Sequence, residues 1–110
     1  MPDIPRPAAI RGRTIRFAWT EGPTKGKVHQ HIFHQDGTVE YGASGEAHPQ
    51  YAAFEVTPDV YTVSYLAPSG FTLTVVLNFV THEIVGVASN NEQWHPLRGT
   101  FEVDASAPMR

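Results

Sequence analysis

The 110-residue sequence contains no cysteine, which excludes a disulfide framework, a catalytic thiol and a thiolate metal site. It also lacks any apolar run near the ~20 residues that a membrane-spanning helix needs. Its start is rich in proline and lacks the apolar segment of a signal peptide. We therefore expect a cytoplasmic protein that does not act at a membrane.

Lysine and arginine are absent between positions 28 and 97, although this segment contains acidic residues throughout. A protein that binds nucleic acid needs a basic face to neutralise phosphates, and the middle of this chain does not provide one. The group formed by Arg11, Arg13 and Arg16 is explained more simply as solvated charges on the outward face of a strand. The sequence therefore argues against a nucleic-acid partner.

Apolar and polar residues alternate over most of the chain from position 14, and turn-forming segments rich in glycine, proline and aspartate separate the alternating stretches. This pattern predicts short antiparallel strands joined by turns. No stretch has a convincing helical period, although 90–97 has room for one short turn. We expect strands or hairpins at 14–19, 27–43, 51–56, 60–67, 71–79, 84–89 and 100–103.

A sheet of about 7–8 such strands either splits into a sandwich or closes on itself, and closure removes the exposed edges. We therefore predict an all-β fold, a small antiparallel up-and-down barrel of the calycin or lipocalin type. The single barrel domain is expected at 12–104, between a loose proline-rich N-terminal arm at 1–11 and a C-terminal tail at 105–110. A barrel of about eight strands has an interior just able to hold one small ligand.

The hairpin at 27–41 contains the most informative pattern in the chain. Side chains alternate between the two faces of a strand, so His29, His31 and Phe33 share one face. A mostly apolar face that carries two imidazoles is more typical of a small-molecule pocket than of a plain core.

Two registers are open to this hairpin. If 35–37 form the loop, with Gly37 as the left-handed residue, Val39 and Tyr41 join the face that carries the histidines. If the turn has only two residues, the register slips by one and Glu40 replaces them. We prefer the first register because it groups the apolar side chains.

Three segments resemble the MoaF-like family of small barrels: 12–17 (GRTIRF), 69–79 (SGFTLTVVLNF) and 86–90 (GVASN). The likeness extends in motif order over roughly 12–103. The family takes its name from an association with molybdenum cofactor synthesis, which implies little about the chemistry of this chain.

A more distant resemblance is to the phenolic acid decarboxylases, whose calycin-type barrel would have the same strand order. The tyrosines that hold the substrate carboxylate in that family are matched here by Phe17 and Trp19, and the catalytic glutamate is matched by Ala67. The expected arginine has no counterpart before Arg98, and the extra C-terminal helices are missing. The resemblance therefore supports the fold and an internal pocket, and argues against decarboxylation by that mechanism.

We identify His29, His31 and Tyr41 as candidate catalytic residues, because an imidazole with a pKa near ~6.5 exchanges protons at neutral pH and a phenol donates a hydrogen bond. The alternative is that both histidines are neutral and satisfied by neighbouring hydroxyls. The candidate ligand-binding residues, which share the inward faces of the expected strands, are Phe17, Trp19, Phe33, Tyr61, Tyr65, Leu73 and Val75.

A metal site is not expected. Two histidines on one strand face are a common start for such a site, but no carboxylate falls on the predicted inward face to act as a third ligand. The segment 94–98 leaves two possibilities open. It could fold over the barrel mouth and bring His95 or Arg98 to the entrance, or it could be a surface loop whose Trp94 plugs the barrel end.

Three functions remain. The first, narrowly favoured, is a cofactor-independent enzyme of the lyase or isomerase type that performs acid–base chemistry on a small apolar or aromatic substrate. The second is a lipocalin-like binder of a small molecule, and the third is an accessory protein whose barrel is filled by its own side chains. Outward apolar residues such as Val28, Ile32 and Val76 indicate a homodimer.

Overall fold

The computed structural model describes residues 4–41, 49–67 and 69–104. These residues contain eight strands and no helix, and the strands form one antiparallel sheet in the order β3-β2-β1-β8-β7-β6-β5-β4. The prediction of a small all-β barrel is confirmed. The strands are β1 (Arg13–Glu21), β2 (Val28–Phe33), β3 (Val39–Tyr41), β4 (Tyr51–Thr57), β5 (Val60–Leu66), β6 (Thr72–Asn78), β7 (Glu83–Ser89) and β8 (Trp94–Val103).

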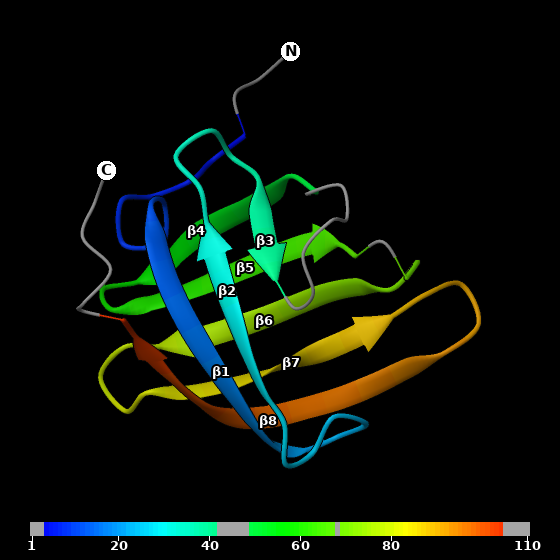
Figure 1. The fold of residues 1–110 in the computed structure, drawn as a ribbon. Helices are drawn as coiled ribbons and strands as arrows, with labels where there is room; N and C mark the ends of the chain where they lie inside the picture. Colours follow the sequence, from blue (N-terminus) through cyan, green and yellow to red (C-terminus); the bar gives the residue numbers. More distant parts are fainter. Residues whose placement is uncertain (1–3, 42–48, 68, 105–110) are drawn as a thin grey trace.

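The sheet curls so that β1, β2 and β3 cross over the strands β4 to β7, while β8 pairs with both β1 and β7 (Figure 1). The edge strands β3 and β4 approach each other beside an isolated bridge between Thr38 and Gln50. Two backbone hydrogen bonds flank this bridge, from Val39 N to Pro49 O (2.9 Å) and from Tyr51 N to Gly37 O (3.1 Å). The barrel is therefore nearly closed.

The β2–β3 hairpin has the register that groups its apolar residues. Phe33 pairs with Val39 and His31 with Tyr41, and Gly37 has a φ of 95° in the left-handed region. The three-residue loop is thus confirmed, because a two-residue turn would have shifted every pair by one position.

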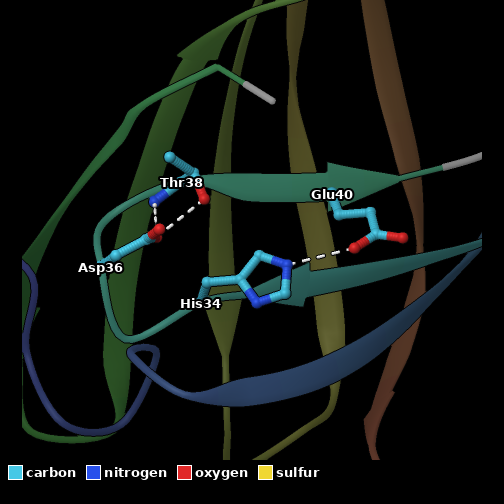
Figure 2. A network of polar contacts seen from close by, with 4 residues as sticks. All are labelled: His34, Asp36, Thr38 and Glu40. Atoms are coloured by element: carbon cyan, nitrogen blue, oxygen red, sulfur yellow. Dashed lines mark hydrogen bonds and ion pairs between the residues drawn. The ribbon is translucent and has the colours of Figure 1, made fainter. Parts of the chain in front are cut away.

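Polar side chains hold the turn of this hairpin in shape (Figure 2). One carboxylate oxygen of Asp36 accepts hydrogen bonds from the backbone N–H (3.0 Å) and the hydroxyl (2.7 Å) of Thr38. Further along, His34 Nε2 lies 3.1 Å from a carboxylate oxygen of Glu40. A side chain that bonds the backbone two residues on mimics a turn, which explains why this loop forms at Asp36.

Successive side chains of a strand point to opposite faces of the sheet, so every second residue of each strand points into the barrel. His31, Phe33 and Val39 are all buried, as the shared face of the hairpin predicted. Aromatic contacts extend through this interior: the Phe33 ring packs edge-on against Tyr51. The other buried apolar residues are Ile10, Ile15, Phe17, Trp19, Ala53, Val63, Tyr65, Val75, Leu77, Ile84, Leu97 and Phe101.

The N-terminal segment from residue 4 to 11 differs from the loose arm expected. Ala53 N donates a hydrogen bond to Pro5 O (2.9 Å), and Arg6 Nε donates to Tyr51 O (2.8 Å). Ile10 is fully buried in the core. These contacts pack the segment against β4, beside the β2–β3 turn (Figure 1).

Strand β8 is longer than the 100–103 segment expected from the sequence, since it begins at Trp94. Pro96 and Gly99, which usually interrupt strands, obscured the pattern. Gly99 is required here because a side chain at this position would collide with the Ala18 carbonyl oxygen of β1. Trp94 is 68% exposed and does not plug the barrel. No helix in the described ranges is suited to crossing a membrane.

Candidate functional site

A cavity of about 540 Å³ lies at the end of the barrel where the β1–β2 and β5–β6 connections are found. Among the residues that the structure describes, the lining contains no aspartate, glutamate, lysine or arginine, and its few polar side-chain groups are hydroxyls, imidazoles and the indole N–H of Trp19. The lining residues are Trp19, Pro23, Thr24, His29, His31, Tyr65, Ala67, Ser69, Phe71, Leu73, Ala88, His95 and Leu97.

His31 is the most deeply buried polar residue of this lining, with 2% of its surface exposed. Its Nε2 lies 2.8 Å from the hydroxyl of Tyr65, which comes from β5 across the barrel. Its ring stacks on Phe17 with 4.1 Å between the ring centroids. Burial lowers the pKa of His31 to about 3, against a smaller upward effect of a backbone hydrogen bond with His29. His31 is therefore neutral at physiological pH.

His29 is held by its neighbour on β1. The indole Nε1–H of Trp19 donates to His29 Nδ1 at 3.3 Å. Because an indole N–H can only donate, Nδ1 must be the unprotonated nitrogen and the neutral ring carries its hydrogen on Nε2. Burial, followed by the positive charge of Lys27, lowers the pKa of His29 and so favours this neutral form.

The structure brings half of the predicted site residues together around this cavity. The five that line it are Trp19, His29, His31, Tyr65 and Leu73. Alternation along the strands placed them correctly on the inward face, and the cavity lies where their side chains meet.

The other predicted site residues lie elsewhere. Phe17, Phe33 and Val75 are buried in the core and are not part of the cavity lining. Tyr61 is half-buried and packs edge-on against Phe79, with ring centroids 5.5 Å apart. The backbone of Tyr41 pairs with His31, but the Tyr41 side chain falls outside the part of the chain that the structure describes.

Several lining residues were not predicted. Thr24 and Ser69 belong to connections between strands, where alternation assigns no face. Ala88 lies in a strand that the sequence predicted, but its small side chain gave no signal of a role. Of the two residues considered for the entrance, His95 lines the cavity, with its ring 5.9 Å from that of Phe71. Arg98 points outward toward Glu21, at 3.7 Å.

No group of three or more metal-ligating side chains is arranged around a common point in the ranges 4–41, 49–67 and 69–104. Ala67, which matches the catalytic glutamate of the phenolic acid decarboxylases, lines the cavity as an apolar residue. The carboxylate chemistry of those enzymes therefore has no counterpart at this position.

A solved structure from Burkholderia vietnamiensis, described as a "putative beta-lactamase", resembles this one with a TM-score of 0.69 over 89% of this chain and 98% of that chain. The two sequences are 16% identical, so this likeness shows the fold alone. No curated protein matches the sequence. The model of the MoaF N-terminal domain matches residues 3–93, which include every strand except β8. The chain therefore belongs to the MoaF family.

Proposed function

We propose that this protein binds a small, largely apolar molecule in the cavity of its barrel. The observation that carries the proposal is a cavity of about 540 Å³ whose described lining residues include no charged acid, lysine or arginine and only a few polar groups. Pockets for small ligands are typically ~300–1,000 Å³ and combine apolar walls with a small number of oriented polar groups. Trp19, Tyr65 and Phe71 line this space and leave it unfilled, which favours a binder over a barrel packed by its own side chains.

The state of the histidines favours binding over acid–base catalysis. A general base works best when its pKa lies near the working pH. Burial holds the pKa of His31 at about 3, so its imidazole is a poor proton acceptor at neutral pH. The lyase or isomerase activity expected from the sequence stays a prediction, as do the catalytic roles of His29 and Tyr41.

The homodimer also stays a prediction. Of the outward residues that motivated it, Val28 is 62% exposed, while Ile32 and Val76 are half-buried on the outer face of the sheet.

A single-tryptophan variant provides the direct test. The protein has two tryptophans: Trp19 lines the cavity, whereas Trp94 is exposed. In Trp94→Phe, the indole N–H resonance belongs to Trp19 alone. We expect this resonance to shift saturably when naphthyl methyl ketone, an uncharged aromatic probe, is titrated into isotope-labelled protein. A resonance that stays unchanged up to the solubility limit of the probe would contradict the proposal.

A further inference from the structure

We propose that the cavity selects uncharged, flat apolar molecules that carry a carbonyl-type hydrogen-bond acceptor, and that His29 is the residue that recognises this acceptor. The inference rests on the proposed binding function and adds to it a ligand class and a residue that determines specificity.

The hydrogen bond from Trp19 fixes which nitrogen of the His29 ring carries a hydrogen. Trp19 occupies the Nδ1 edge with its N–H, so the hydrogen of the neutral ring is on Nε2, at the opposite edge. His29 is half-buried and lines the cavity. A ligand that meets this edge is offered a donor, and its matching group is an oxygen or nitrogen acceptor.

Two polar groups deep in the cavity, on Tyr65 and His31, already contact each other. The hydroxyl of Tyr65 and Nε2 of His31 lie 2.8 Å apart and satisfy each other across the barrel. A ligand atom that competes for either group must break a buried hydrogen bond, which is unfavourable unless the ligand replaces it. His29 needs no such exchange, since its bond to Trp19 uses the other ring nitrogen.

The side chains around the cavity disfavour a charged ligand. Within the ranges 4–41, 49–67 and 69–104, no side chain of the lining is an acid, a lysine or an arginine, so an ion among these residues would lose its hydration without gaining a counter-charge. Burial keeps the pKa values of His29 and His31 low, which means that the cavity already disfavours a positive charge on its own groups. The cavity therefore discriminates against carboxylates and amines of the same shape.

Two cations near the cavity, Lys27 and Arg98, could favour an anionic ligand, so a carboxylate is included among the test compounds. Lys27 is close enough to His29 to lower its pKa, and Arg98 borders a surface groove that shares Pro23, His95 and Leu97 with the cavity. A ligand with an anionic end could place its carboxylate outside, at these cations. Arg98 is exposed and faces Glu21 at 3.7 Å, which weakens its attraction for an anion.

Four naphthalene derivatives of nearly equal shape test the selection: the methyl ketone, its isopropenyl analogue, the carboxylate and the amidinium. Binding is measured in Trp94→Phe from the Trp19 indole resonance. We expect the ketone to bind about tenfold more tightly than the isopropenyl compound, which has the same outline but no acceptor, because a donor without a partner is costly in a buried site. The carboxylate and the amidinium are expected to bind at least about tenfold more weakly than the ketone.

Two substitutions assign the effect to His29. His29→Phe keeps a flat ring but removes the donor, and should make the ketone and the isopropenyl compound bind equally. His29→Gln keeps an N–H donor and should retain part of the preference. Because either change alters the environment of Trp19, each titration is referred to the free variant.

The outcomes separate this inference from the proposed function. Equal binding of the ketone and the isopropenyl compound to the protein with His29 would overturn the acceptor selection while leaving the binding function intact. Tighter binding of the carboxylate would overturn the selection for uncharged ligands and point to Lys27 or Arg98. Failure of all four compounds to bind would reject both proposals.

Discussion

Replacing Ala88 by phenylalanine is expected to weaken binding of naphthyl methyl ketone by about a hundredfold, which corresponds to about 2.7 kcal/mol. Ala88 lies on β7 between its strand partners Leu73 and His95, and all three line the cavity. A phenylalanine ring at this position projects into the space that the probe needs. The loss is measured from the Trp19 resonance in the Trp94→Phe background.

The neighbouring position offers a matched control. The Val87 side chain is on the outer face of β7 and 37% exposed, so Val87→Phe adds a similar ring without entering the cavity. This variant should bind the probe as the parent protein does. Equal losses in Ala88→Phe and Val87→Phe would indicate damage to β7, and unaltered binding in Ala88→Phe would place the ligand elsewhere.

Lowering the pH from 7 to 5 is expected to reduce the free energy of unfolding by about 2 kcal/mol through His31 alone. In the folded protein the pKa of His31 is about 3, whereas in the unfolded chain it returns to 6.5. Below pH 6.5 the unfolded chain therefore takes up a proton that the folded protein refuses. The stabilising contribution is present above this pH and is lost progressively as the pH falls toward 3.

Urea unfolding at pH 7, 6 and 5 measures this effect, and two variants isolate its cause. His31→Gln has no titrating group and should have a dependence on pH that is flatter by about 2 kcal/mol over this range. Tyr65→Phe removes the hydroxyl partner of His31 but keeps the ring buried, so its pH dependence should remain close to that of the parent. If His31→Gln retains the full dependence, burial of a neutral imidazole is not the reason for it.

Alternation was sufficient to predict which side chains enter the barrel, but not how deep each one lies along its axis. Phe17 and Trp19 share the inward face of β1, yet Trp19 lines the cavity and Phe17 belongs to the core. The difference depends on how the strands tilt and stagger when the sheet closes. A period of two residues contains no information on that geometry.

The β2–β3 hairpin could be predicted because local residues determine it, whereas the extent of β8 could not be predicted from its own residues. The register of the hairpin depends on local turn chemistry at Gly37, which the sequence displays. Strand β8 forms despite Pro96 and Gly99, because it pairs on one side with the preceding strand β7 and on the other with β1, which lies far away in the chain. Thr24 and Ser69 line the cavity because the β1–β2 and β5–β6 connections lie at the same end of the barrel, and no local sequence pattern predicts this placement.

The most direct test of cavity binding is a crystal structure of the protein grown with naphthyl methyl ketone. We predict that the ligand lies in the cavity beside Trp19 and Tyr65, with its carbonyl oxygen within hydrogen-bond distance of His29 Nε2. A barrel in which Trp19, Tyr65 and Phe71 pack against one another and leave no cavity would contradict the account.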